Sequence, residues 1–304
     1  MSKSVSKISA CAIIITYQPE PAVLLSLLQQ ISAQADFILI DNASTNTQAF
    51  LPQAQALPRC RHVQVLERNL GLAAAMNLGL GWVREAGYGY AVLFDQDSQV
   101  PASFFADMHS AYVEAQRLCD QRVAAVGPRI ISPINGRAMP FKLFSRWFRR
   151  SDRRVPGTQR LYRADFLISS GCMLSLAALE EIGPMREAYF IDNVDLEWCF
   201  RARARGYLLV GSDTAVLHHS IGVASDNALV KRGWVVNHSP LRSYYSTRNR
   251  FALYREPYAP LGWKLRDFPR FVLKTLWLLL CSSQRAEYWR QIRRGLADVR
   301  SVAQ

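Results

Sequence analysis

The sequence predicts an α/β fold with a mostly parallel β-sheet flanked by helices. Short β-rich runs alternate with amphipathic runs in the N-terminal third of the 304-residue chain, an order typical of βαβ units. Two predicted strands end in polar residues, at Asp41-Asn42 and at Asp95-Gln96-Asp97. Ligands of open α/β sheets bind outside the carboxyl ends of the strands, so we expect the functional site where these two strands end.

The elements of the first half follow one another in regular order. The hydrophobic patterns predict three strands and two intervening helices, in the order strand 8–16, helix 22–33, strand 37–40, strand 63–66 and helix 71–85. An apolar run then leads to Asp95 and Asp97, and a helix is expected from about Ala102.

The second half is less regular. Residues 141–163 carry eight basic side chains opposed only by Asp152, which predicts a mobile basic loop. The later patterns predict an apolar stretch at 166–170, a helix at about 192–205, a strand at 215–217 and helices beyond Pro240. These patterns divide the chain into a main domain, 1–238, and a C-terminal helical extension rich in basic and aromatic residues, 239–304.

The composition is that of a globular protein with a basic excess. The chain has 37 Lys and Arg against 24 Asp and Glu, a net charge of +13, and 50% hydrophobic residues. This composition excludes disorder, a collagen repeat and a disulfide miniprotein, and it indicates an anionic partner. The six cysteines are scattered without a C-x-x-C pair, which favours a reduced cytoplasmic setting. The best apolar candidate, 271–281, is interrupted by Lys274, so we expect no membrane-spanning helix.

Asp95 and Asp97 are the first candidates for chemistry. No G-x-G-x-x-G or G-x-x-x-x-G-K-[ST] motif occurs, which argues against a dinucleotide-dependent dehydrogenase and a P-loop enzyme. Two carboxylates at the end of a buried strand need a cation or hydrogen-bond donors, and Mg²⁺ or Mn²⁺ is a natural partner. Alternatively, the two aspartates only cap the turn before the next helix.

Seven short motifs occur along the chain in one order. They are Ile15-Thr16-Tyr17, Ile40-Asp41-Asn42, Asn69-Leu70-Gly71-Leu72-Ala73, Phe94-Asp95-Gln96-Asp97-Ser98, Phe190-Ile191-Asp192-Asn193-Val194-Asp195-Leu196-Glu197-Trp198-Cys199, His219-Ser220-Ile221-Gly222 and Tyr244-Tyr245-Ser246-Thr247-Arg248-Asn249-Arg250. Together they resemble family 2 glycosyltransferases with the Rossmann-like GT-A fold, and among these the bacterial rhamnosyltransferases. The resemblance covers about residues 12–253 and implies that 1–238 is a GT-A catalytic domain.

The resemblance implies a nucleotide site at the first two strand ends. Thr16 and Tyr17 would lie along the nucleobase, and Asp41 would accept a hydrogen bond from the pyrimidine N3–H. Asn69 and Gly71 would form a loop close to the nucleotide, where a glycine avoids a Cβ clash. Alternatively, Asp41 only closes a turn, and Gly71 only starts the following helix.

The resemblance also implies a metal site for Mg²⁺ or Mn²⁺. Asp97 would bind the ion directly, and Asp95 would reach the ribose or the water shell of the ion. His219 would be a further ligand; since adjacent side chains on an extended segment point to opposite faces, only one of His218 and His219 should face the metal.

Asp192 is the expected general base in this resemblance. Many relatives have two adjacent acids here, whereas this chain has Asn193 at the second position, which leaves Asp195 as the alternative base. Since they are three residues apart, Asp192 and Asp195 would share one face of a helix, or only favour its N-terminus.

Arg248 is the expected partner of the leaving diphosphate, together with Arg250, because a guanidinium binds phosphate oxygens in a fork. Alternatively, both arginines lie on a solvated helix face and pair with nearby acids.

The implied reaction is a direct, inverting displacement that moves L-rhamnose from dTDP-L-rhamnose to a hydroxyl of a lipid-linked surface glycan. A UDP-hexose or another sugar nucleotide is the alternative donor, and nucleic-acid binding is disfavoured because it gives the aspartates no role.

The assignments above give no role to the basic and aromatic residues of 141–163 and of the C-terminal extension. They suit a peripheral contact with an anionic membrane on its cytoplasmic side. Alternatively, the C-terminal helices pack on the catalytic domain or on a second subunit.

Overall fold

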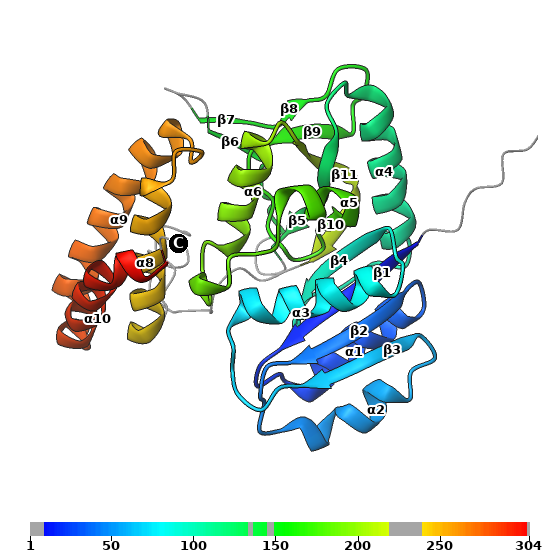
Figure 1. Ribbon diagram of the computed structural model, residues 1–304, viewed down its shortest axis with the longest axis horizontal. Coiled ribbons are helices and arrows are strands. Elements are labelled where there is room, and N and C mark those ends of the chain that lie inside the picture. The colour runs from blue at the N-terminus through cyan, green and yellow to red at the C-terminus, as the bar shows by residue number, and fades with distance from the viewer. Residues whose placement is uncertain (1–8, 133–135, 145–148, 219–238, 303–304) are drawn as a thin grey trace, which may run out of the picture.

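The computed structural model describes residues 9–132, 136–144, 149–218 and 239–302. Within these residues, nine strands form one sheet in the order β3-β2-β1-β4-β10-β5-β11-β9-β8 (Figure 1). The strands are β1 (Ala10–Thr16), β2 (Asp36–Asp41), β3 (Cys60–Val65), β4 (Tyr90–Asp95), β5 (Val123–Ile131), β8 (Arg153–Arg154), β9 (Leu161–Ala164), β10 (Met173–Ser175) and β11 (Leu208–His218). A separate hairpin joins β6 (Lys142–Phe144) and β7 (Arg149–Ser151).

Most of the central strands run in one direction. β1 pairs in parallel with β2 and β4, β2 with β3, and β11 with β5. The short strand β10 is antiparallel to both β4 and β5, so these two strands also share a direction. The carboxyl ends of β1, β2, β4, β5 and β11 therefore lie at one edge of the sheet, as the sequence predicted.

Helices cover both faces of the sheet. They are α1 (Pro21–Ser32), α2 (Leu51–Gln55), α3 (Leu72–Glu85), α4 (Phe104–Leu118), α5 (Leu176–Ile182) and α6 (Val194–Ala204). One core lies between the sheet and α3, α5 and α6, and the other between the sheet and α1 and α4. Successive residues of β1 alternate between them, with Ile13 in the first core and Ile14 in the second, because neighbouring side chains of a strand point to opposite faces.

The prediction of a loop at 141–163 is wrong for the parts of that segment that form strands. β9 pairs with β11, and its residues Leu161 and Ala164 are buried. β8 lies at the edge of the sheet, where Arg153 and Arg154 are exposed. Charge density misled the prediction because an edge strand can direct basic side chains to solvent while its neighbour fills the core.

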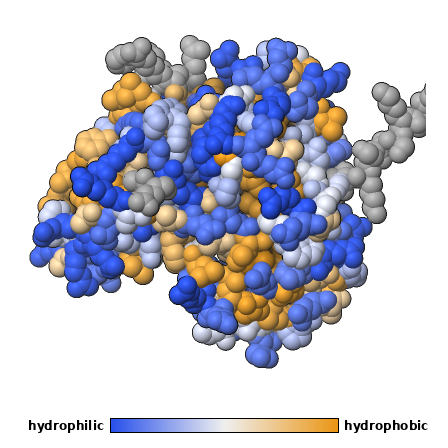
Figure 2. Space-filling model, viewed as in Figure 1, coloured by the Kyte–Doolittle hydropathy of each residue, from blue (hydrophilic) through white to orange (hydrophobic). Residues whose placement is uncertain are grey.

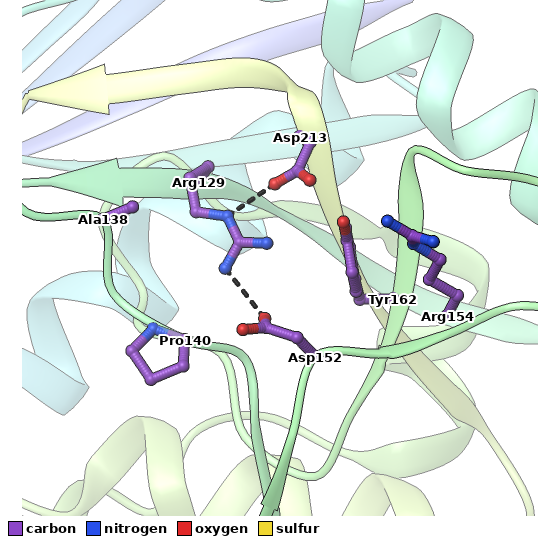
Figure 3. A pocket seen from close by; sticks show the side chains of 7 residues that line it. All are labelled: Arg129, Ala138, Pro140, Asp152, Arg154, Tyr162 and Asp213. Atoms are coloured by element: carbon purple, nitrogen blue, oxygen red, sulfur yellow. Dashed lines mark hydrogen bonds and ion pairs between the residues drawn. The ribbon is translucent and has the colours of Figure 1, made fainter.

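Arg129 of β5 fixes this part of the fold. Its guanidinium donates to Asp213 of β11 at 2.5 Å and to Asp152 at 2.9 Å, and it lies over the ring of Tyr162 (Figure 3). These groups line an open cavity of about 710 Å³ together with Arg154. Both carboxylates on this wall are engaged by Arg129, and none of the residues lining the cavity belongs to the site predicted from the sequence.

The C-terminal helices pack on the main domain through α8 (Figure 1). They are α8 (Pro240–Arg255), α9 (Leu261–Cys281) and α10 (Arg285–Ala297). Leu253 of α8 and Trp263 at the start of α9 share a small buried cluster with Leu196 and Phe200 of α6. Packing of the C-terminal helices on the main domain, one of the alternatives left open by the sequence, is therefore present for α8 and the start of α9. In the described part of the chain, no helix combines the length and apolar character that spanning a membrane requires.

Candidate active site

The ends of β1 and β2 are joined through the carboxylate of Asp41. Thr16 donates its hydroxyl to Asp41 at 2.7 Å, and Ser44 donates both its main-chain N–H at 2.8 Å and its hydroxyl at 2.6 Å. Thr16 and Asp41 are fully buried. A carboxylate has about four acceptor positions, so Asp41 retains capacity for one further donor. The turn-closing role that the sequence left open for Asp41 is therefore present.

Gln96 links the end of β1 to the end of β4. Its side-chain oxygen accepts from the Tyr17 main-chain N–H at 2.8 Å, and its amide donates to the Tyr17 carbonyl at 3.3 Å. The Tyr17 side chain is 51% exposed at this edge. The strand end that carries Asp95 and Asp97 is thus held beside Thr16 and Tyr17.

The loop before α3 is held by the paired side-chain amides of Asn42 and Asn69. Asn42 donates to Asn69 at 3.0 Å, and Asn69 accepts from the Gly71 main-chain N–H at 2.9 Å. Gly71 has a φ of +88°, and a Cβ there would lie 2.5 Å from the ring of Phe190. Packing and backbone conformation therefore require this glycine, and Gly71 is also the residue before α3, as one alternative expected.

Asp95 and Asp97 lie at the carboxyl end of β4, with one residue between them. Beside them the hydroxyls of Ser98 and Ser170 are 2.8 Å apart, and both side chains are buried. His218, the last residue of β11, pairs with Gln99 through main-chain bonds, which brings the end of β11 next to this turn. His219, the expected metal ligand, lies outside the described residues.

The donor set at this turn fits a hard divalent cation. Carboxylate oxygens are what Mg²⁺ and Mn²⁺ prefer, and such ions complete their shells with water and phosphate oxygens. Within the described residues, no three His, Cys, Asp or Glu side chains come together to form a complete protein cage. The described carboxylates thus fit an ion that is also held by a phosphorylated ligand.

The segment before α6 has an unusual backbone. Phe190, Asp192 and Asn193 have φ values of 61°, 65° and 62°, in the left-handed region that non-glycine residues rarely adopt. The Phe190 carbonyl accepts from the Leu72 N–H at 2.6 Å, at the start of α3. The segment is therefore tied to the loop that contains Gly71.

Helix α8 holds this segment in place. The amide of the buried Asn249 donates to the main-chain carbonyls of Tyr189 and Ile191, each at 2.7 Å, and of Asp192 at 3.0 Å. Arg248 donates to the carbonyl of Ala188 at 2.5 Å. The contacts of α8 thus offset the free-energy cost of the strained backbone at Asp192, the predicted base, and its neighbours.

Asp192 precedes α6, which begins at Val194. The expectation that Asp192 and Asp195 share a helical face is therefore wrong, because Asp192 and Asn193 are left-handed and the helix begins only after them. Arg242 of α8 binds the Asp192 carboxylate with Nε and Nη2 at 2.9–3.2 Å. Lys274 of α9 is nearby: burial lowers its pKa to about 8, Arg250 acts in the same direction, and the charge of Asp192 opposes the shift.

Asp195 lies in the first turn of α6, close to Asp95. Its carboxylate accepts from the main-chain N–H of Leu196 at 2.9 Å and of Ser169 at 3.4 Å. Burial, and to a smaller extent the negative charge of Asp95, raise the pKa of Asp195 from 3.8 to about 6, although the N–H donors oppose the shift. A carboxyl with such a pKa is largely ionised at neutral pH and can still take up a proton.

The two arginines expected at the diphosphate have other partners in this structure. Arg248 is buried against the carbonyls of Ala188 and Tyr189. Arg250 donates to Asp267 of α9 at 2.7 Å, which matches the alternative of pairing with a nearby acid.

Sequence reasoning did not assign roles to several residues that build the site. Gln96, Ser170, Arg242 and Asn249 all make contacts that bring its parts together. For Gln96, Arg242 and Asn249 the only available signal was a position inside or beside the quoted motifs, and Ser170 lies in none of them. Their partners are 50 to 79 residues away in the sequence, so spacing could not reveal them.

Known proteins share this sequence pattern and fold. Residues 11–183 match the family described as Glycosyl transferase family 2. The dTDP-rhamnosyl transferase RfbF of Shigella flexneri is 29% identical over 281 residues, which are 92% of this chain and 91% of that protein.

Two solved structures are similar over nearly the whole chain. S. aureus TarS (residues 1–349), in complex with UDP-GlcNAc, has a TM-score of 0.59 at 15% identity and matches 95% of this chain and 81% of its own. GalNAc-T7, with UDP, GalNAc and Mn²⁺, has a TM-score of 0.63 at 14% identity and matches 98% of this chain. The match spans 58% of the GalNAc-T7 chain. At these identities, the likeness establishes the fold.

Proposed function

The chain belongs to glycosyl transferase family 2, and we propose that it transfers L-rhamnose from dTDP-L-rhamnose to a hydroxyl group of a surface-glycan acceptor, with inversion at the anomeric carbon. The observation that carries the donor assignment is the 29% identity with a dTDP-rhamnosyl transferase over almost the full length of both proteins. The site at the carboxyl edge of the sheet supports the reaction class, because it gathers acidic and amide side chains from four separate segments.

The nucleotide would lie along the ends of β1 and β2. Tyr17 supplies an exposed ring at that edge, and Asp41 has acceptor capacity for a base that offers an N–H. Thymine and uracil both offer this donor at N3, whereas cytosine does not, so the contact favours these two bases without distinguishing one from the other. Asn69 and Gly71 form the adjacent loop and would approach the ribose or the phosphates.

A divalent ion, Mg²⁺ or Mn²⁺, would be held by Asp97 and Asp95, and it would neutralise the diphosphate as it leaves. The Mn²⁺ present in the GalNAc-T7 structure supports this part of the proposal. His219 stays in the proposal as a further ligand, because it follows directly on His218 at the end of β11.

We assign the general base to Asp195 rather than Asp192, which reverses the order expected from the sequence. The Asp192 carboxylate is bound by two nitrogen atoms of Arg242, so a proton taken up there would compete with that ion pair. Within the described residues, the Asp195 carboxylate accepts from the main-chain N–H groups of Ser169 and Leu196, and its pKa of about 6 suits a base at neutral pH. Asp195 would take the proton of the acceptor hydroxyl as the oxygen attacks the anomeric carbon. Asp192 would then hold Arg242 and the end of α8 in place.

The acceptor side of the proposal is a glycan carried on a lipid diphosphate, reached by a protein bound peripherally at the cytoplasmic side of a membrane. The net charge of +13 supports attraction to an anionic surface. A second copy of the chain is the other candidate partner for the C-terminal helices.

Calorimetric titration with dTDP, UDP and GDP, each with Mg²⁺, with Mn²⁺ and with EDTA, tests the donor site. Metal-dependent binding that favours dTDP supports the proposal and makes dTDP-L-rhamnose the donor to assay. Tighter binding of UDP would replace rhamnose with a UDP-hexose, and tighter binding of GDP would contradict a thymine or uracil site at the ends of β1 and β2. A donor-hydrolysis assay with sugar conjugates of the nucleotide that binds most tightly then identifies the sugar.

A further inference from the structure

We propose that helix α9 binds an anionic lipid surface through its outward face, as an amphipathic helix lying in the plane of the membrane. This inference deepens the proposed function, because it names the surface on which the chain would meet a lipid-linked acceptor. The bound state buries the apolar face of α9 among the lipid chains and places neighbouring arginines at the lipid phosphates.

The outward face of α9 is a continuous apolar stripe. Most of its main members are three or four residues apart, a spacing that places them on one side of a helix. They are Leu261, Leu265, Phe268, Leu273, Leu276 and Leu280, and they are 49% to 76% exposed. Figure 2 shows hydrophobic residues along the left edge of the molecule, where Figure 1 places α9. Monomeric soluble proteins rarely expose a run of this length, so the stripe indicates a binding surface.

The opposite face of α9 is already occupied. Trp263 is buried in the cluster with Phe200, Leu278 is 3% exposed, and Asp267 accepts from Arg250 and from the Tyr254 hydroxyl, each at 2.7 Å. These contacts fix the rotation of α9 about its axis. The helix therefore cannot turn to bury its stripe against α8.

The charges beside the stripe favour lipid over a second copy of the chain. Asp267 is the only acid within α9, and it faces α8. Arg270 on α9 and Arg285 and Arg293 on α10 are exposed. Two copies of a chain with a net charge of +13 would bring these cations together across the stripe, whereas an anionic bilayer supplies both hydrocarbon and negative charge.

The length and composition of α9 agree with an interfacial position. The helix has 21 residues, but it contains Lys264, Arg266, Arg270 and Lys274, and it does not meet the requirements of a membrane-spanning helix. Lys274 lies on the side toward Asp192, so the outward stripe and the catalytic segment are on opposite sides of the same helix. Membrane binding through the stripe would leave the contacts with the catalytic segment intact.

Vesicle flotation of the full chain tests the proposal. The probes are vesicles of phosphatidylcholine with phosphatidylglycerol at 3:1, a ratio of about one anionic lipid in four, and vesicles of phosphatidylcholine alone. We expect binding to the anionic vesicles that weakens with added salt. The double variant L273E/L276E should bind at least about tenfold more weakly, because it places two charges within the stripe. Val113→Glu is the matched control, since Val113 is 50% exposed on α4 at a site away from α9; it should bind like the parent chain.

Three results would overturn the proposal: no binding to anionic vesicles, equal binding of the double variant, or a dimer in light scattering that L273E/L276E dissociates. Circular dichroism and dTDP titration of the variants separate this inference from the proposed function. If the double variant keeps its affinity for dTDP but no longer binds vesicles, the result supports α9 as the membrane-binding surface. If the parent chain binds vesicles but not dTDP, the proposed donor is wrong, whereas the proposal for α9 is unaffected.

Discussion

Arg242 and Asp192 form a two-pronged ion pair between α8 and the segment that leads into α6, with nitrogen–oxygen distances of 2.9–3.2 Å. The pair crosses from the C-terminal helices to the catalytic domain and occupies both oxygens of the carboxylate. It distinguishes Asp192, the base expected from the sequence, from the alternative Asp195, which accepts from main-chain N–H groups instead of an arginine and has a raised pKa.

We expect Asp195→Asn to lower kcat by about 10²-fold to 10⁴-fold, because the acceptor hydroxyl loses its base. The affinity for dTDP should stay within about twofold of the parent value, since Asp195 is not assigned to nucleotide binding. Asp192→Asn is the comparison variant, and we expect a smaller loss. If Asp192→Asn is the inactive variant and Asp195→Asn retains turnover, the assignment of the base is wrong.

Transfer should depend on the ionisation of Asp195. The pKa of this carboxyl is raised to about 6, so the ionised base predominates above pH 6 and is lost as the pH falls through that value. A profile of log(kcat/KM) against pH should bend near pH 6 with unit slope on the acidic side. In Asp195→Asn the residual activity should lack this bend, and a parent profile that is flat down to pH 5 would contradict the prediction.

The same carboxyl should reduce stability at neutral pH. A folded-state pKa of about 6 against 3.8 means that the ionised form is less favourable in the folded chain than in the unfolded one. This cost is absent below about pH 4, develops as the pH rises from 4 to 6 and is complete above 6. Asp195→Asn should therefore raise the free energy of unfolding by on the order of 1 kcal/mol at pH 7.5. Thermal melts of both proteins at pH 4 and pH 7.5 test the sign, and a variant that is less stable at pH 7.5 refutes it.

Asn249→Ala should lower kcat more than it raises KM for the donor. The substitution removes the donor to three carbonyls that hold the left-handed segment, so that Asp195 and Asp192 lose their positions. We expect a loss of about tenfold to 10²-fold in kcat, because a displacement of about 1 Å can cost that much. Arg255→Ala, at an exposed position of the same helix, should behave like the parent chain. An equal loss of activity and melting temperature in both variants would mean that α8 has only a general structural role.

Asp97→Asn should abolish metal-dependent binding of dTDP while the fold is preserved. The Asp97 carboxylate is the proposed direct ligand, and an amide is a much weaker ligand for Mg²⁺ or Mn²⁺. Transfer should fall by at least about 10²-fold. Calorimetry with Mn²⁺ and with EDTA measures the loss, and a variant with unchanged, EDTA-sensitive binding would remove Asp97 from the site.

The sheet and its functional edge were predictable because they depend on local patterns. Alternating apolar runs predicted β1, β2 and β4, and the polar residues after Asp41 and at Asp95 indicated where these parallel strands end. Both strand ends lie at the same edge of the structure, as the direction of a parallel sheet requires.

The contacts that distinguish the two candidate bases were beyond sequence reasoning. Arg242 lies 50 residues from Asp192, and the sequence contains many other arginines that could have paired with it. The left-handed conformation of Asp192 and Asn193 also has no sequence signature, since neither is a glycine, and it makes the helix begin two residues later than predicted. In 141–163, the charges hid the short edge strands because exposed strand positions tolerate arginine.

The hydrogen bond from Asn249 to the Asp192 carbonyl also affects the order in which parts of the protein can fold during synthesis. Asn249 is synthesised 57 residues after Asp192, so the ribosome completes the sheet and α6 well before the amide that secures the catalytic segment exists. A nascent chain therefore carries its nucleotide edge before the catalytic segment is secured, and a chain cut short before α8 would lack the Arg242 and Asn249 contacts that hold this segment.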